Sequence, residues 1–313
     1  MGKNLLFVLL FCGLLLSIKI TMNVGDKSVK ASLSTDYNYE TNLKQDIFSL
    51  MMAYPEHIVD IEVVDNSIVY FSLKSGGKIL YDNNQSDKMT NPDLKSMMEQ
   101  RYILHSIDKL MPQEYNPGRI RVYPLLKEIY GANQYEIEKN LSGVKVGSNF
   151  HRFNDNNNGA NHLKSAISEL NTLAEKNPRL WAYIYPIGGA YNFRYIAKTS
   201  RLSPHAFGIA IDLASSKDDY WQWASRTAGE KRIRNYPKEI VDVMERNHFV
   251  WGGKWGQFDI LHFEYRPEII MKAMYFSNET KDVWFENLPA SNMAVSELIC
   301  LIEDRLQNFV VPN

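Results

Sequence analysis

Two short stretches of the sequence carry imidazoles and carboxylates that could share one site. His205 lies just before a predicted strand that carries Asp212, while Asp259 and His262 stand three residues apart at the entry to another predicted strand. A carboxylate on an otherwise apolar strand is costly unless it is exposed, paired or bound to a metal. If the two strands pair, two imidazoles and two carboxylates meet at one sheet edge.

Such a set has the composition of a catalytic zinc site. Two imidazoles and one carboxylate are a standard three-ligand set for zinc, with the fourth position left to water. The second carboxylate is then available as a general base. Each stretch alone also has an ordinary interpretation, because Asp212 can cap a turn and His262 can be a satisfied core histidine.

The order of these residues resembles a known family. The pattern Ser-x-His-x-x-Gly-x-Ala-x-Asp, which ends at Asp212, is followed by Trp-Gly-Gly-x-Trp, which ends at Trp255, and by Asp-x-x-His-Phe-Glu, which ends at Glu264. This series is similar to the zinc D-alanyl-D-alanine carboxypeptidases and L-alanyl-D-glutamate endopeptidases, the VanY-type enzymes of peptidoglycan metabolism. The resemblance runs from about Pro117 to Glu268 and is dense from Gly188 onward.

The resemblance implies roles for particular side chains. His205, Asp212 and His262 would hold zinc, Asp259 would be the general base, and Arg194 would bind substrate charge. Zinc lowers the pKa of a bound water toward 7 and polarises the scissile carbonyl. The ordinary alternative for Arg194 is a surface arginine.

Three further residues flank the expected metal motif. Ser203 and Glu264 are candidates for orienting the imidazoles through hydrogen bonds, as outer partners of metal ligands do. Their alternatives are a backbone cap and a surface carboxylate. Trp255 is the best candidate for a wall of the substrate cleft, and its alternative is a core residue.

The leading hypothesis is a zinc peptidase that acts on peptidoglycan stem peptides. Carboxypeptidase and endopeptidase need the same metal and base, and the sequence favours the carboxypeptidase only slightly. A non-catalytic wall-binding module that keeps zinc is a second hypothesis, although Asp259 would have no purpose there. A third is a membrane-anchored scaffold whose function lies in residues 24–110.

Composition and the start of the chain limit the cellular setting. Of the 313 residues, 45% are hydrophobic and 23% charged, a globular balance, and the net charge of −1 makes nucleic acid a poor partner. Lys3 precedes an apolar run, Leu5–Ile18, that is shorter than the ~20 residues of a bilayer span. This pattern predicts a secretory signal or an uncleaved N-terminal anchor, and hence an extracytoplasmic location. The oligomeric state stays open.

The expected fold is α+β. A small, mostly antiparallel sheet would carry helices on one side and the zinc cleft along the other, with a small N-terminal α+β module in addition. The predicted domains are a signal or anchor (1–23), an accessory module (24–115), a zinc peptidase domain (116–275) and a helical tail (276–313). Predicted strands include Ile58–Val64, Ile68–Leu73, Lys78–Tyr81, Val144–Phe153, Trp181–Pro186, Gly208–Leu213 and Phe258–Tyr265. The run Asn154–Gly159 predicts a turn before a helix rather than a calcium loop, because it lacks carboxylates at the key places.

Overall fold

Alternating apolar residues form a three-stranded meander near the start of the described chain. The computed structural model describes residues 39–85, 87–88, 90–277 and 283–312. Strand β1 (Ile58–Val64) pairs antiparallel with β2 (Ile68–Leu73), and β2 pairs antiparallel with β3 (Lys78–Leu80). The turn between β1 and β2 holds Asp65 and Asn66 at positive φ, which short polar side chains tolerate. These strands lie where the alternation of apolar residues predicts them.

A β-hairpin and the longest helix follow. Strand β4 (Leu141–Val146) pairs with β5 (Asn149–Asn154), so the predicted single strand is a hairpin that turns at Gly147. A 3₁₀ turn at 156–158 then leads into α6 (Gly159–Lys176), as the asparagine-rich run predicts. Helix α6 buries one apolar face, whose members are Leu163, Ala166, Ile167, Leu170 and Ala174.

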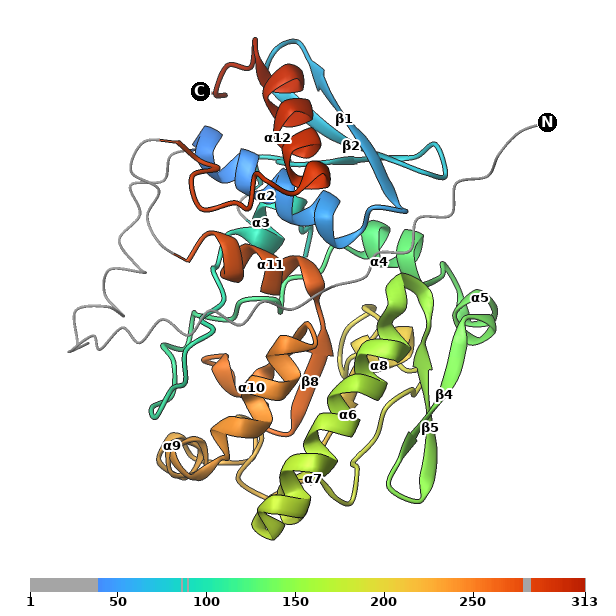
Figure 1. The fold of residues 1–313 in the computed structure, drawn as a ribbon, viewed down its shortest axis with the longest axis vertical. Coiled ribbons are helices and arrows are strands. Elements are labelled where there is room, and N and C mark those ends of the chain that lie inside the picture. The colour runs from blue at the N-terminus through green and yellow to red at the C-terminus, as the bar shows by residue number, and fades with distance from the viewer. Residues whose placement is uncertain (1–38, 86, 89, 278–282, 313) are drawn as a thin grey trace. The chain divides into compact units, whose positions relative to one another are not determined.

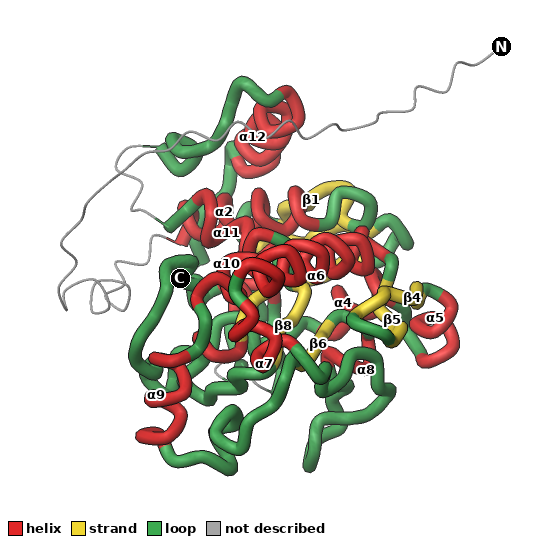
Figure 2. Tube along the Cα trace, turned by 60° about the horizontal axis from the view of Figure 1, so that its bottom comes forward, coloured by secondary structure: helices red, strands yellow, loops and turns green. Residues whose placement is uncertain are grey.

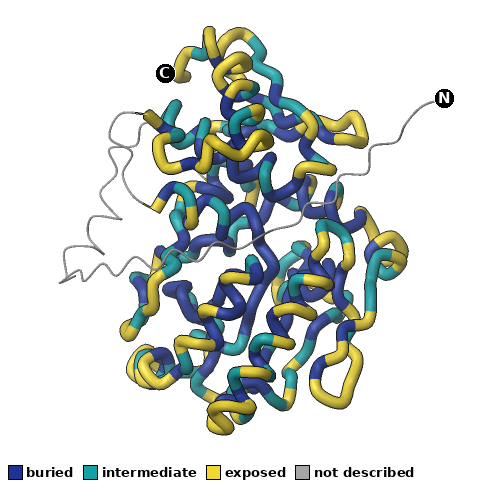
Figure 3. The backbone as a smooth tube through the Cα atoms, in the orientation of Figure 1, coloured by how far each residue is buried: buried dark blue, intermediate teal, exposed yellow. Residues whose placement is uncertain are grey.

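A second three-stranded sheet carries the predicted metal residues. Its order is β6 (Ala210–Asp212), β8 (His262–Tyr265) and β7 (Phe249–Trp251), and both pairings are antiparallel. Helix α10 (Lys238–Arg246) packs against β7, and α6 packs against α10. Figure 2 shows α6 and α10 over β8, which is buried along its whole length (Figure 3). The α+β class with small antiparallel sheets is confirmed.

Helices from the two ends of the described chain pack on one another. Helix α2 (Tyr39–Ala53) contacts α11 (Pro267–Tyr275) and α12 (Met293–Leu306), as Figure 1 shows. The Phe48 ring meets those of Tyr275, Phe276 and Trp284 edge to face, with centroids 5.7 to 6.2 Å apart. The predicted domain boundaries after residues 115 and 275 remain predictions, and the predicted signal or anchor (1–23) lies outside the described residues.

The remaining helices are short and connect these layers. They are α3 (Leu94–Met98), α4 (Tyr123–Tyr130), α5 (Gln134–Lys139), α7 (Trp181–Ile184), α8 (Pro204–Phe207) and α9 (Arg226–Asn235). Within the described part of the chain, no helix combines the length and hydrophobicity that crossing a membrane requires.

The predicted strand Trp181–Pro186 is wrong, and the predicted strand Phe258–Tyr265 begins only at His262. Residues 181–184 form helix α7 instead of a strand, after a 3₁₀ turn that begins at Pro178. The alternating aromatics at 181, 183 and 185 suggest a period of two, but Trp181 and Tyr185 also have the i, i+4 spacing of a helix. Their ring centroids lie 5.7 Å apart, so the helical spacing is the one that the chain uses.

Candidate metal centre

A single capped helical turn presents His205. Ser203 is the N-cap of α8, and its hydroxyl accepts a hydrogen bond from the backbone N–H of His205 at 3.3 Å. Pro204 occupies the first helical position, where its missing N–H costs nothing. The His205 Nδ1–H donates to the Ala190 carbonyl oxygen at 2.6 Å. Because a carbonyl only accepts, this bond fixes the tautomer and leaves the lone pair on Nε2.

Gly208 ends the turn and starts the strand that carries Asp212. Its φ of +69° is in the left-handed region, and a Cβ there would lie 2.5 Å from Leu141 Cδ2. Two residues later the chain enters β6, whose last residue is Asp212. The Asp212 backbone is held on its outer side by Gly188 and Gly189, since Gly188 N–H donates to its carbonyl at 2.8 Å and its own N–H donates to Gly189 O at 2.8 Å.

The sheet register brings His262 opposite Asp212. The two residues are direct antiparallel partners at the edge where β6 ends and β8 begins. His262 Nδ1 lies 2.9 Å from Asp212 Oδ1, and His205 Nε2 lies 3.3 Å from both of these atoms. Three ligand atoms therefore form a triangle with edges of 2.9, 3.3 and 3.3 Å.

This triangle fits one zinc ion. Ligand atoms about 2.0–2.1 Å from a tetrahedral zinc lie about 3.3 Å from one another, which matches the observed edges. Two imidazole nitrogens and a carboxylate oxygen are also the donor types that zinc prefers. Among the residues that the structure describes, His205, Asp212 and His262 form a group whose ligand atoms lie close enough together to hold one metal ion.

The charges in the cluster favour a cation. Burial raises the pKa of Asp212, but hydrogen bonds from His205 and His262 outweigh it and hold that pKa well below the usual range. Burial alone would lower the pKa of His262, but Asp212 and Glu264 raise it to about 10. An imidazole nitrogen coordinates a metal only without its proton, so metal binding at His262 would release one.

Asp259 lies one turn before His262. Its carbonyl accepts from the His262 backbone N–H at 3.1 Å, and its own N–H donates to Gly252 O at 3.0 Å. Burial raises the pKa of the Asp259 carboxyl to about 6, with the Asp212 charge adding to the rise and the His262 charge opposing it. A carboxyl with a pKa near neutrality, beside a cluster of metal ligands, suits proton transfer.

The other predicted site residues differ in their relation to the cluster. Glu264 is fully buried, with Oε2 3.7 Å from His262 Nε2, so it is not a surface carboxylate. Trp255 is buried and its ring centroid lies 5.7 Å from that of His262. Arg194 is exposed, and its carbonyl accepts from Ser203 N–H at 3.0 Å, which ties its loop to α8. The expected cleft remains a prediction.

Two arginines near the site are absent from the sequence-based set. Arg121 donates from Nε to Glu264 Oε1 at 2.8 Å and from Nη2 to Oε2. Arg119 lies over the Trp255 ring, 5.3 Å from its centroid, and donates from Nη1 to Gln257 O at 2.8 Å. The residues that Arg119 and Arg121 contact lie more than one hundred positions away in the sequence, so no local pattern predicts these contacts. The sequence indicates only that the pattern changes after Pro117.

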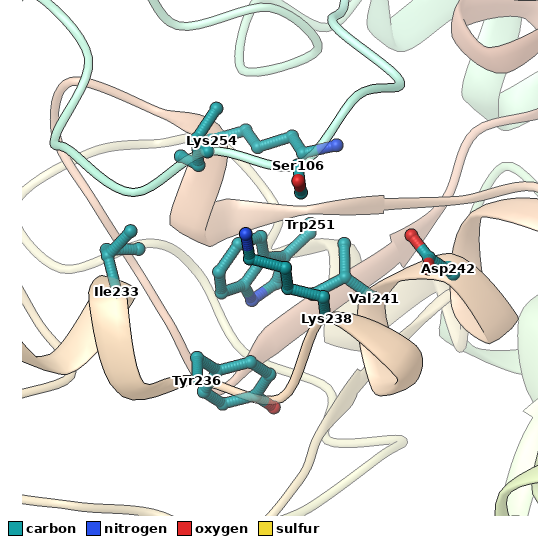
Figure 4. Close-up of a pocket in the computed structure, with 9 residues that line it drawn as sticks. Ser106, Ile233, Tyr236, Lys238, Val241, Asp242, Trp251 and Lys254 are labelled. Carbon is teal, nitrogen blue, oxygen red and sulfur yellow. The ribbon is translucent and has the colours of Figure 1, made fainter. Parts of the chain in front are cut away.

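A small hollow elsewhere in the molecule is not the substrate site. It lies beside Tyr236, Trp251 and Lys254 and has a volume of about 10 Å³ (Figure 4). That volume suits about one water molecule. It is too small for a peptide, and none of the three clustered ligands lines it.

Comparison with known families finds a match over part of the chain. Residues 197–265 match the family model described as D-alanyl-D-alanine carboxypeptidase. The predicted family resemblance is confirmed. The matched segment contains the ligand triangle, Asp259 and Glu264, while Arg194 precedes it. No curated protein and no solved structure matches the chain significantly.

Proposed function

We propose that the protein is a zinc-dependent peptidase that hydrolyses an amide bond in peptidoglycan stem peptides, as a D-alanyl-D-alanine carboxypeptidase does. The observation that carries the proposal is the triangle of His205 Nε2, Asp212 Oδ1 and His262 Nδ1, whose edges match a single zinc ion. The family match over the same residues supports peptidoglycan peptides as the substrate class.

The residues around the triangle supply proton transfer. Zinc bound there would lower the pKa of a water molecule and polarise the scissile carbonyl. The Asp259 carboxylate takes the proton of the attacking water and passes it to the leaving amine. A pKa of about 6 lets Asp259 be ionised at neutral pH while remaining a good acid for the second step.

Arg194 is proposed to meet the negative charge of the substrate. Its exposed position and the hydrogen bond from Ser203 to its carbonyl place its loop next to the turn that carries His205. A guanidinium there can bind a terminal carboxylate through paired hydrogen bonds. Trp255 packs on His262 from within the fold, so its contribution is to hold that ring.

The proposal is tested by digesting purified peptidoglycan with zinc-loaded protein and measuring muropeptide masses. Loss of a terminal D-Ala supports the carboxypeptidase, and release of L-Ala would instead support the endopeptidase of the same family. Asp259→Asn should retain zinc and lose cleavage. If zinc-loaded wild-type protein binds the wall but leaves every muropeptide intact, the peptidase proposal is wrong and the binding-module hypothesis replaces it.

A further inference from the structure

The second nitrogen of His262 faces a buried charge network. Nδ1 belongs to the ligand triangle, while Nε2 lies 3.7 Å from Glu264 Oε2, a charge contact rather than a hydrogen bond. Two guanidinium nitrogens of Arg121, Nε and Nη2, donate hydrogen bonds to the two carboxylate oxygens of Glu264. A bidentate arginine fixes the plane of a carboxylate, so Arg121 determines where Glu264 meets the ring.

The network continues away from the metal site. Arg266 Nη1 lies 3.3 Å from Glu264 Oε1, and Arg266 Nε donates to Glu268 Oε1 at 2.6 Å. The other oxygen of Glu268, Oε2, accepts from the Tyr54 hydroxyl at 2.6 Å. Tyr54 follows helix α2, which packs on the helix that carries Glu268, although the two residues are 214 positions apart in the sequence.

Burial makes the members of this network depend on one another. Glu264, Arg266 and Tyr54 are fully buried, Glu268 is nearly so, and the Arg121 side chain is 9% exposed. The two cations and two carboxylates balance, and removing one partner of a buried charge is costly. Arg266 contacts both Glu264 and Glu268, so the loss of a donor at Glu268 leaves that carboxylate more dependent on the cation that it shares with Glu264.

We propose that Arg121 and Tyr54 are positioning residues for His262. Arg121 acts through Glu264, and Tyr54 acts through Glu268, Arg266 and Glu264 in turn. The segment around Tyr54 therefore supports the metal site as well as packing against the rest of the fold. The inference rests on the proposed zinc site, because its effect is on how tightly His262 holds the ion.

The chain offers a matched control for Tyr54. Tyr81 is also a buried tyrosine of the N-terminal segment, and its hydroxyl donates to the buried carboxylate of Asp46 at 2.8 Å. Asp46 pairs with the buried ammonium of Lys272, just as Glu268 pairs with Arg266. Tyr81→Phe thus removes the same kind of hydrogen bond from the same kind of ion pair, but outside the network that reaches His262.

The test is competition for zinc between the protein and a chelator, with unfolding by urea measured in parallel. Loss of an outer partner of a metal ligand costs about 10- to 100-fold in affinity, so Arg121→Lys should weaken zinc binding about tenfold. Tyr54→Phe acts through more links and should weaken it on the order of threefold, a smaller effect of the same kind. Tyr81→Phe should lower stability by a similar amount and leave zinc affinity unchanged.

The outcomes separate this inference from the proposed function. If wild-type protein binds no zinc, the metal site itself is wrong. If wild-type protein binds zinc and both Tyr54→Phe and Arg121→Lys bind it equally well, the positioning network is wrong and the metal site stands. An equal loss in Tyr54→Phe and Tyr81→Phe would assign the effect to general destabilisation and would also overturn the inference. Should Tyr54→Phe fail to fold, Arg121→Lys alone decides.

Discussion

At the scale of single residues, different surroundings shift the pKa values of Asp212 and Asp259 in opposite directions. Asp212 meets two imidazoles and keeps its charge, whereas Asp259 is buried with less compensation and its pKa rises to about 6. A pair of acids whose pKa values are pushed apart can divide metal binding and proton transfer between them. Residue spacing and family resemblance suggest this division, and the observed hydrogen bonds supply a physical reason for it.

The first prediction is that catalysis falls in acid as Asp259 takes up a proton. Only the ionised carboxylate is a base, so kcat/KM should drop about tenfold per pH unit below a midpoint at or below about 6. Zinc places positive charge beside the carboxylate and can only move the midpoint downward. The profile is measured on zinc-saturated protein. If kcat/KM instead falls in acid with a midpoint above pH 7, the general base is a group other than Asp259.

The second prediction concerns the ligands themselves. His205→Ala removes one corner of the triangle and leaves two ligand atoms, too few for a tetrahedral site with one open position. Stoichiometric zinc should be lost on dialysis, whereas Asp259→Asn should retain it. Metal analysis of the dialysed proteins checks this. Full zinc retention by His205→Ala would remove that side chain from the coordination sphere.

At the scale of elements, the long periodic segments were predictable and the short connecting ones were not. Strands β1 and β2 have their predicted bounds because two strand-like runs of six or seven residues, joined by the turn residues Asp65-Asn66-Ser67, are a clear signal. Helix α8 has four residues, too few to show any period, yet it presents His205. Likewise the pairing of Arg121 with Glu264 joins residues 143 apart, which no local pattern encodes.

The third prediction tests the turn between α8 and β6. Gly208→Ala places a Cβ at a φ of +69° and 2.5 Å from Leu141, so both backbone strain and a clash oppose it. We expect a loss of about 1–3 kcal/mol in the free energy of unfolding, together with weaker zinc binding. Urea unfolding and chelator competition measure the two effects.

Two other glycines separate the causes of that loss. Gly76 has a positive φ, but a Cβ added there would have no neighbour within 4 Å. Gly189 has no positive φ, and a Cβ added there would also have no neighbour within 4 Å. Gly76→Ala should therefore cost stability through strain alone, and Gly189→Ala should be close to neutral. If Gly208→Ala is as stable as Gly189→Ala, the turn does not need the conformation seen here.

At the scale of the whole molecule, buried polar contacts join α2 and the residue after it to α11, the helix that follows strand β8. Lys272 of α11 pairs with Asp46 of α2, and Glu268 of α11 accepts from Tyr54. Buried pairs of this kind contribute little net stability, but removing one partner is costly. The predicted N-terminal module is therefore joined to α11, the helix that follows strand β8, by specific polar contacts as well as by apolar packing, which composition and hydropathy do not reveal.

The final prediction is a pH dependence of folding that originates at His248. Its Nδ1 is buried with no hydrogen-bond partner among the described residues, its ring centroid lies 4.8 Å from that of His162, and its φ is +65°. Burial first, and the His162 charge second, lower the pKa of His248 to about 4 from the ordinary 6.5. The unfolded chain therefore binds the proton more readily, and stability from this residue is present above pH 6.5 and is lost as pH falls toward 4, by at most about 1.4 kcal/mol per pH unit.

His248→Asn keeps a side chain that tolerates positive φ and does not titrate. Urea unfolding of both proteins should show the wild-type advantage shrinking between pH 7 and about pH 4.5, whereas a difference that stays constant with pH would show that folding does not shift the pKa of His248.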